Sequence, residues 1–158
     1  MKNYYYTEIG ELANLIRQQV ISPVKIVESC LKRIEKLNPT LNAFITILGN
    51  QAIEEAKIAE LEIKNGKWKG PLHGIPIGIK DFYDTKDVRT TAAFEEFRNR
   101  IPKKDAKSVT KLKRAGAIII GKTNMHTLGM GTTGLASVFG PAKNPWNDKY
   151  IPGGSSSG

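Results

Sequence analysis

The sequence has little cysteine and little histidine, which excludes several kinds of site. Cys30 is the one cysteine among 158 residues, so an intrachain disulfide is excluded and a reducing compartment is expected. His73 and His126 are the two histidines, and neither a Cys-x-x-Cys nor a His-Glu-x-x-His pattern occurs. The metal-ligand spacings that characterise zinc sites are therefore missing.

Long apolar runs are also lacking. The longest one, Ala117 to Ile120, is far too short to cross a bilayer. No long apolar run follows Met1–Tyr6, as it would in a secretory signal. We therefore expect a cytoplasmic protein with no membrane partner.

Two nucleotide-binding patterns match by spacing and fail by context. Residues 116–123 fit the P-loop spacing, but an apolar strand fills the interval where a P-loop has an irregular loop. Residues 129–134 fit the dinucleotide fingerprint but lack a strand directly before them and a clear helix after them. We reject both matches and expect no cofactor.

Charge of positive sign is in excess. Lys and Arg number 24 against 15 Asp and Glu, a net charge of +9, which admits a non-enzymatic nucleic-acid-binding domain as an alternative. The lysines are dispersed, however, and acidic residues are mixed among them, as in Glu54-Glu55 and Glu60-Leu61-Glu62. This pattern favours solvated helix faces, and we expect no nucleic-acid partner.

Apolar spacing predicts an N-terminal helical portion over residues 1–70. A first helix is expected over 7–20 with Thr7 as its N-cap, and a second from Ser22-Pro23 to just before Asn38-Pro39. Cys30 lies on the apolar stripe of the second helix, so we interpret it as a core residue. A strand over 44–48 and a third helix over about 51–64 follow.

The composition changes at Pro71, where Gly, Pro and Thr become frequent. Short apolar strands are expected over 75–79 and 117–120, with a helix over 107–115 between them. This order favours an α/β fold with a largely parallel or mixed sheet. We expect residues 71–158 to form the first part of a core domain.

Two groups of residues have the position and type that catalysis requires. Lys80 ends the apolar strand, where α/β enzymes place reactive groups, and desolvation there would lower its pKa until the neutral amine can accept a proton. Ser155, Ser156 and Ser157 lie between glycines and include candidates for a proton relay or a nucleophile. By position alone, a surface lysine and a flexible Gly/Ser run are the simpler interpretations.

Five segments stand out together, namely residues 72–81, 89–91, 115–125, 139–141 with 144–146, and 152–158. Taken together they resemble the amidase signature family, in family order and with family-like gaps. The resemblance covers residues 72–158 closely and residues 1–70 less specifically, and it implies an incomplete amidase-signature fold, a mixed β-sheet flanked by helices.

The resemblance implies cleavage or transfer of carboxamides through a Ser-Ser-Lys triad. Lys80 matches the triad lysine, and Ser155 matches the bridging serine, which in the family follows a cis peptide bond. Met130, Gly131 and Thr132 match a segment that lines the substrate cleft, so a small-molecule amide is the expected partner.

The family's nucleophilic serine lies in a later glycine-rich segment, beyond residue 158. We therefore expect this chain to hold two of the three triad members and to have little or no activity alone. Ser156 and Ser157 have no family support as replacements. Apolar surface left uncovered by such a truncation would promote self-association. Smaller departures are Asp87, where many relatives have Gly, and Ala136, where relatives often have Asn.

Alternatives remain open. The A subunit of a related tRNA-dependent amidotransferase is the nearest one, although Asn124-Met125-His126 and Thr132-Thr133-Gly134 favour a free-standing amidase. His126 either lines the cleft or has a hydrogen-bonded structural role. A degenerate gene product without function is a further alternative.

Overall fold

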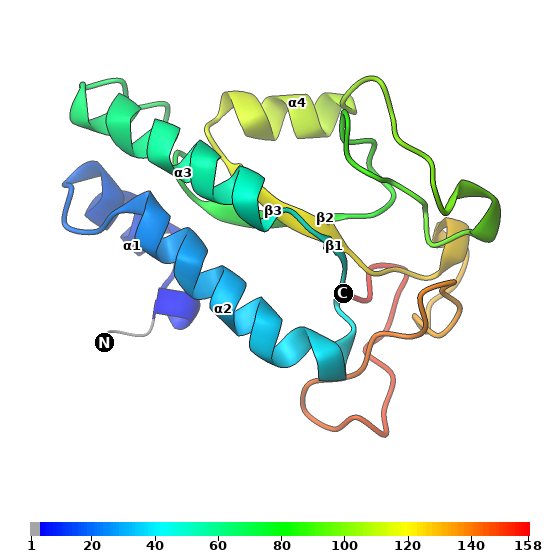
Figure 1. Ribbon diagram of the computed structural model, residues 1–158. Helices are drawn as coiled ribbons and strands as arrows, with labels where there is room; N and C mark the ends of the chain where they lie inside the picture. Colours follow the sequence, from blue (N-terminus) through cyan, green and yellow to red (C-terminus); the bar gives the residue numbers. More distant parts are fainter. Residues whose placement is uncertain (1–3) are drawn as a thin grey trace. The chain divides into compact units, whose positions relative to one another are not determined.

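The computed structural model describes residues 4–158 and contains helices, 3-10 turns and one three-stranded sheet (Figure 1). The chain folds into two compact units that interleave along the sequence. Unit 1 comprises residues up to Ile34, Leu48–Ile77 and Thr110–Ile120, and unit 2 comprises Glu35–Ile47, Gly78–Val109 and Gly121–Gly158. The expected division into 1–70 and 71–158 stays a prediction.

The first helix, α1 (Ile9–Arg17), is shorter than expected, and Thr7 as its N-cap is wrong. The Thr7 N–H donates to Tyr4 O over 3.2 Å, after the 3-10 turn η1 (Tyr4–Tyr6), so Thr7 belongs to that turn. Glu8 takes the N-cap position, with no side-chain cap bond. The helix ends early because the chain turns at Gln19, which has φ 58°.

The second helix, α2 (Pro23–Leu41), begins where the sequence predicts. Ser22 Oγ accepts the Val24 N–H over 3.0 Å, as a capping serine does. The expected end before Pro39 is wrong, because the helix continues through Pro39 to Leu41. Asn38 explains the continuation: its side chain donates to Phe44 O (3.0 Å) and accepts the Phe44 N–H (2.7 Å), which fixes the helix end against the next segment.

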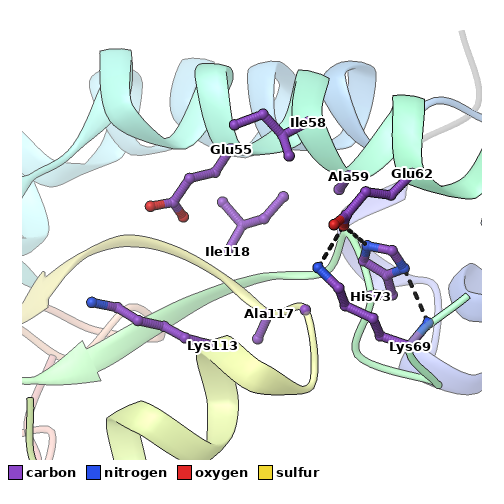
Figure 2. Close-up of a pocket in the computed structure, with 10 residues that line it drawn as sticks. Glu55, Ile58, Ala59, Glu62, Lys69, His73, Lys113, Ala117 and Ile118 are labelled. Carbon is purple, nitrogen blue, oxygen red and sulfur yellow. Dashed lines mark hydrogen bonds and ion pairs between the residues drawn. The ribbon is translucent and has the colours of Figure 1, made fainter. Parts of the chain in front are cut away.

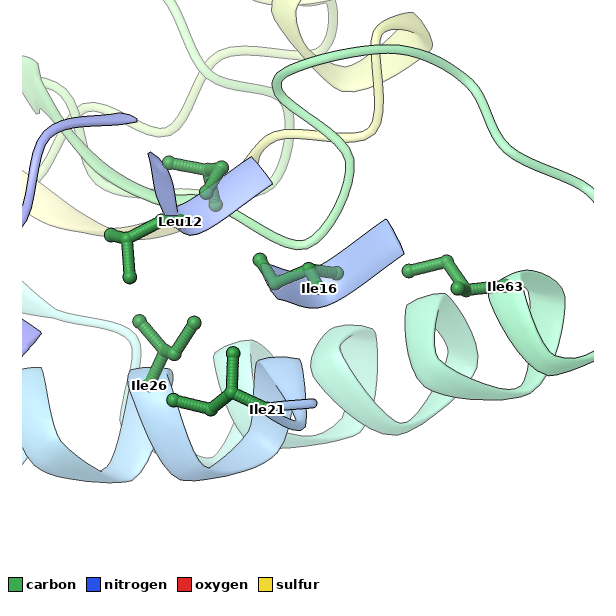
Figure 3. Close-up of a cluster of buried hydrophobic side chains, with 6 residues drawn as sticks. Leu12, Ile16, Ile21, Ile26 and Ile63 are labelled. Carbon is green, nitrogen blue, oxygen red and sulfur yellow. The ribbon is translucent and has the colours of Figure 1, made fainter. Parts of the chain in front are cut away.

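A cluster of buried aliphatic side chains forms the core of unit 1 (Figure 3). Ile16 and Ile26 are 1% and 2% exposed, and Cys30 packs against the cluster as a partly buried apolar residue. The helix α3 (Gly49–Lys64) contributes Ile63. Each such side chain contributes roughly 1.5–3 kcal/mol when it is removed from water. The remaining buried members are Leu12, Ile21 and Ile75.

The sheet consists of the strands β1 (Phe44–Ile47), β2 (Pro76–Lys80) and β3 (Ile118–Thr123). Its order is β1-β3-β2 and it is mixed, as the sequence predicts. Phe44 lies opposite Thr123 in the antiparallel pair of β1 and β3. Parallel register between β2 and β3 follows from two hydrogen bonds, Ile118 N–H to Ile75 O (2.9 Å) and Asp81 N–H to Thr123 O (3.0 Å).

The remaining elements are short. The helix α4 (Lys107–Arg114) precedes β3, as expected, and the 3-10 turns η2 (Glu95–Phe97) and η3 (Thr127–Gly129) lie in unit 2. Strand β3 is buried over most of its length, which explains the apolar run at its start. Within residues 4–158, no helix has the length and apolarity that crossing a membrane requires.

Candidate functional site

Lys80 and Ser155 lie in direct contact in unit 2. Lys80 Nζ donates a hydrogen bond to Ser155 Oγ over 2.6 Å, although 75 positions separate the two residues along the chain. Both side chains are partly buried. The structure therefore brings together the two residues that the sequence singled out from separate segments.

Strand β2 and the turn after it position Lys80. The strand ends at Lys80, and the following Asp81 donates its N–H to Thr123 O of β3 over 3.0 Å. The chain then turns, because Tyr83 N–H donates to Lys80 O over 3.0 Å. The lysine is thus the last residue of a hydrogen-bonded strand, where its backbone is fixed.

Backbone contacts with the segment after β3 position Ser155. The Gly154–Ser155 peptide bond is cis, as the resemblance implies. The His126 N–H donates to Ser155 O over 2.9 Å, and Met125 pairs with Ser156 in an antiparallel bridge. The serine segment, residues 154–157, therefore runs beside the chain that continues from β3, within reach of Lys80 at the end of β2.

The local environment alters the protonation of Lys80. Removal of its ammonium from water lowers the pKa of Lys80 below its ordinary value of 10.5. A lower pKa increases the fraction of neutral amine at a given pH, and a neutral amine can accept a proton from the hydroxyl beside it. The contact can therefore act as a proton relay.

The segment Met130–Thr132 lies against the serine segment through its backbone. A Cβ atom on Gly154 would lie 3.0 Å from Gly131 O and 3.2 Å from the Thr132 carbonyl carbon, so glycine permits this close approach. The Met130 side chain itself is 83% exposed. The structure thus places Gly131 and Thr132 beside the residue that precedes Ser155, with Met130 directly before them in the chain.

His126 has a supporting position between these segments. Its backbone holds Ser155, and its Nδ1 lies 3.4 Å from Thr133 Oγ1. Its ring lies directly beside Gly131, where a Cβ atom would overlap it. The histidine therefore links the serine segment to the Met130–Thr132 segment.

Ser156 and Ser157 differ from Ser155 in their surroundings. Ser156 is exposed, whereas Ser157 is buried, and its Oγ has no hydrogen-bond partner among the described residues. Of the three serines, Ser155 is the one whose Oγ contacts the lysine.

Sequence reasoning missed Asn124 as the residue that organises this region. Asn124 is fully buried, and its Nδ2 donates to Asn42 O (2.9 Å) and Gly140 O (3.0 Å). Its Oδ1 accepts the Ser137 hydroxyl at 2.8 Å, and its backbone O accepts the Gly158 N–H at 2.9 Å. A polar residue directly after a buried strand was the signal that could have identified it.

A buried charge cluster was also missed. Asp81 and Lys122 are both 0% exposed, and Lys122 Nζ lies 3.6 Å from Asp81 Oδ1. In the sequence, Lys122 falls in the rejected P-loop pattern and in the 115–125 segment of the family resemblance, and neither gave it a role of its own. A lysine inside a buried strand was the signal, because lysine is rarely buried without a partner.

The two local departures from the family are Asp87 and Ala136. Asp87 has φ 59°, the left-handed conformation that Asp tolerates better than most residues, so it can replace Gly there. Ala136 contributes its backbone, because its O accepts the Thr127 N–H at 2.6 Å. Neither residue contacts Lys80 or Ser155 through a hydrogen bond within residues 4–158.

A separate pocket of about 190 Å³ lies within unit 1 (Figure 2). Figure 2 shows the Glu62 carboxylate in contact with both Lys69 and His73, whose Nε2 lies 3.0 Å from it. The Lys69 N–H donates to His73 Nδ1 over 3.3 Å, so both ring nitrogens have partners. His73 is 1% exposed, and burial lowers its pKa below 6.5. These contacts indicate a satisfied structural histidine.

Metal-binding geometry is missing from the described part of the chain. Across residues 4–158, no group of three or more His, Cys, Asp or Glu side chains is arranged to hold a metal ion. Cys30 is a free cysteine, and burial raises the pKa of its thiol.

Comparison with known proteins identifies relatives of the whole described chain. The Amidase family model matches residues 25–158. The sequence is 43% identical over 150 residues to the A subunit of the glutamyl-tRNA(Gln) amidotransferase of Geobacter metallireducens, covering 95% of this chain and 31% of that protein. It is 44% identical over 158 residues to the same subunit of Lawsonia intracellularis, covering 100% of this chain and 32% of that protein.

Solved structures agree with these sequence matches. The native peptide amidase of Stenotrophomonas maltophilia superposes with a TM-score of 0.91 at 30% identity, over 98% of this chain and 33% of that one. The chain thus spans about a third of the length of the curated relatives it matches.

Proposed function

The chain belongs to the amidase family, and we propose from this that Lys80 and Ser155 are two members of a Ser-Ser-Lys site that cleaves carboxamides. The observation that carries the proposal is the 2.6 Å contact between Lys80 Nζ and Ser155 Oγ. The lowered pKa of Lys80 supports it, because the lysine must be neutral to act as the base.

In this proposal a proton passes along the two residues toward the amine. Neutral Lys80 accepts the Ser155 hydroxyl proton, and Ser155 takes the proton of the nucleophilic serine. The nucleophile's Oγ then bonds to the amide carbonyl carbon, and the carbonyl electron pair moves onto oxygen. Backbone N–H groups would stabilise that oxyanion.

The same relay then runs in reverse. The tetrahedral intermediate collapses, the C–N bond breaks, and the proton held by Lys80 returns through Ser155 to the leaving nitrogen. Ammonia or an amine departs and an acyl-enzyme remains. Water, deprotonated by the same pair, adds to the acyl carbon, and the ester C–O bond then breaks. The proton returns to the serine Oγ, so the acid is released and the serine is restored.

The resemblance places the nucleophilic serine after residue 158, so residues 1–158 contain two of the three groups. We expect the 158-residue polypeptide alone to release little or no ammonia from simple amides. Turnover by this polypeptide that Ser156→Ala or Ser157→Ala abolishes would contradict that expectation.

The substrate in this proposal is a small-molecule amide that lies along Met130, Gly131 and Thr132. The place of Gly131 and Thr132 beside Gly154 supports the assignment, since a bound amide must lie close to the nucleophile that Ser155 activates. The exposed Met130 side chain offers an apolar contact to such a substrate. Self-association through exposed core surface and a cytoplasmic location both remain predictions.

A second candidate function is amide transfer within a tRNA-dependent amidotransferase. The observation that favours it is the name of the relatives at 43% and 44% identity, the A subunit of such an enzyme. The Asn124-Met125-His126 segment favours the free-standing amidase instead. Hydrolysis of free amides, without any partner protein, by a longer chain that contains residues 1–158 and the nucleophilic serine would favour the amidase.

A chimera tests the proposal. Residues 1–158 replace the matching third of the Stenotrophomonas maltophilia peptide amidase, and hydrolysis of a peptide amide is measured. Lys80→Met and Ser155→Ala should each reduce kcat by about a thousandfold or more, as loss of a member of a catalytic triad does. The exposed neighbours Lys86→Met and Ser156→Ala are the matched controls and should retain activity. Full activity in Lys80→Met would refute the proposal.

A further inference from the structure

Lys122 is a buried lysine that takes no part in the proton relay of Lys80 and Ser155. Its side chain is 0% exposed, and its Nζ donates to Tyr83 O over 2.8 Å and to Thr90 Oγ1 over 2.7 Å. The same Nζ lies 3.6 Å from Asp81 Oδ1. The ammonium thus has three oxygen neighbours from one loop, residues 81–90.

The partner of this ammonium directly follows Lys80. Asp81 Oδ2 accepts both the backbone N–H (2.9 Å) and the hydroxyl of Thr91. The other oxygen, Oδ1, has no hydrogen-bond partner among residues 4–158, so the Lys122 ammonium is the charge that faces it. One carboxylate oxygen of Asp81 therefore faces Thr91, and the other faces the Lys122 ammonium.

The Asp81 backbone is fixed as firmly as its side chain. Its N–H donates to Thr123 O and its O accepts the Ala92 N–H, each over 3.0 Å. Tyr83 N–H donates to Lys80 O, and Tyr83 O in turn accepts the Lys122 ammonium. Hydrogen bonds thus anchor the turn that begins at Lys80, at the Lys80 carbonyl and at the Asp81 N–H that follows it.

Burial of two charges is costly, and an apolar pair of similar volume often stabilises a fold as well or better. Stability is therefore a weak reason for Lys122 to be a lysine. A more specific reason is geometric, because a buried charged pair has one favourable arrangement and holds the attached backbone to it.

We propose that Lys122 is a positioning residue that, through Asp81, fixes the end of β2 from which Lys80 reaches Ser155. The inference rests on the proposed role of Lys80. Its test measures the titration of Lys80 and not turnover, so failure of one proposal is distinguishable from failure of the other.

Three buried threonines in the same loop provide a matched set for the experiment. Thr90 and Thr91 contact Lys122 and Asp81 directly. The Thr85 hydroxyl donates to Tyr83 O over 3.2 Å, so Thr85→Val removes that donor and leaves the contacts of Lys122 with Tyr83 O and Thr90 and of Asp81 with Thr91 in place. Thr85 and Thr90 are each 1% exposed and Thr91 is 0% exposed. Each Thr→Val change therefore removes one buried hydroxyl.

The experiment follows the Lys80 side chain by NMR of the lysine-labelled chain over pH, with its signal assigned by its loss in Lys80→Arg. Loosening of the β2 end admits water to the amine, so Thr90→Val and Thr91→Val should raise the Lys80 midpoint toward 10.5, while Thr85→Val leaves it unchanged. Lys122→Met should raise the Lys80 midpoint in the same direction, because it removes the charge that faces Asp81 Oδ1.

Denaturant unfolding of the same variants separates positioning from stability. Comparable loss of stability in all three Thr→Val variants, with a Lys80 shift confined to Thr90→Val and Thr91→Val, supports the proposal. An unchanged Lys80 midpoint in these two variants overturns it, as does a shift in Thr85→Val of equal size. Because the threonine variants carry the test, misfolding of Lys122→Met does not remove it.

Discussion

The hydrogen bond from Lys80 Nζ to Ser155 Oγ, 2.6 Å long, joins the end of β2 to a glycine-flanked serine segment 75 positions later. The contact depends on two backbones that are held independently. One is the turn after β2, fixed through Asp81, and the other is the segment at Ser155, fixed through His126. A change in either backbone is therefore expected to disturb the contact between Lys80 Nζ and Ser155 Oγ.

The core of unit 1 predicts that two isoleucines on α1 contribute very differently to the free energy of unfolding. Ile16→Ala should lower the free energy of unfolding by about 2–5 kcal/mol, because it leaves a cavity in the buried cluster. Ile9→Ala is the matched control, since Ile9 is 49% exposed, and it should cost about 0.5 kcal/mol or less. Urea unfolding of both variants measures the difference, and equal losses would contradict the assigned core.

Gly154 is predicted to be intolerant of a side chain. A Cβ atom there would lie 2.9 Å from Gly134 N and 3.0 Å from Gly131 O, so the loop backbone must move. Gly154→Ala should therefore lower stability by about 1–3 kcal/mol, the usual cost of overpacking. Gly10→Ala on α1, where the added Cβ meets nothing within 4 Å, should raise stability by about 0.5–1 kcal/mol. Unfolding curves that rank the two variants in the opposite order would refute this.

His73 predicts a pH dependence of stability. Burial holds its pKa below 6.5 in the folded chain, so between that lowered value and 6.5 the unfolded chain binds a proton that the folded chain does not. The free energy of unfolding should therefore rise with pH through this window, and the contribution is lost as pH falls below it.

His73→Gln isolates this contribution. Subtraction of its pH profile from that of the unchanged chain should leave a curve that rises with pH below 6.5 and is flat above it. His126→Gln serves as the matched control and should retain that rise. Parallel profiles for the unchanged chain and His73→Gln would contradict the assignment.

The sequence predicted most of the architecture from local signals. Ser22-Pro23 marked the start of α2 because a serine cap and a first-turn proline act on adjacent backbone groups. The end of α2 could not be read from Pro39, because Asn38 contacts Phe44 and holds the helix together beyond the point where proline usually stops it. Local rules fail at such places because side-chain contacts further along the chain decide them.

The residues of the candidate site could be predicted from the sequence, but the residues that hold them in place could not. Lys80 and Ser155 follow from the family resemblance of short motifs, and the contact between them follows from the fold. Asn124 and the Asp81–Lys122 pair could not be assigned from sequence, because their roles depend on partners in separate segments. A buried polar residue at a strand end indicates a partner without identifying it.

The most direct test of the account is the titration of the Lys80 amine in the unchanged chain and in two serine variants. The account predicts a midpoint below 10.5, because burial disfavours the ammonium. Ser155→Ala should lower the midpoint further, since it removes the hydroxyl that accepts from the ammonium, while Ser156→Ala should leave it unchanged. A midpoint at 10.5 that responds to neither serine would contradict the account.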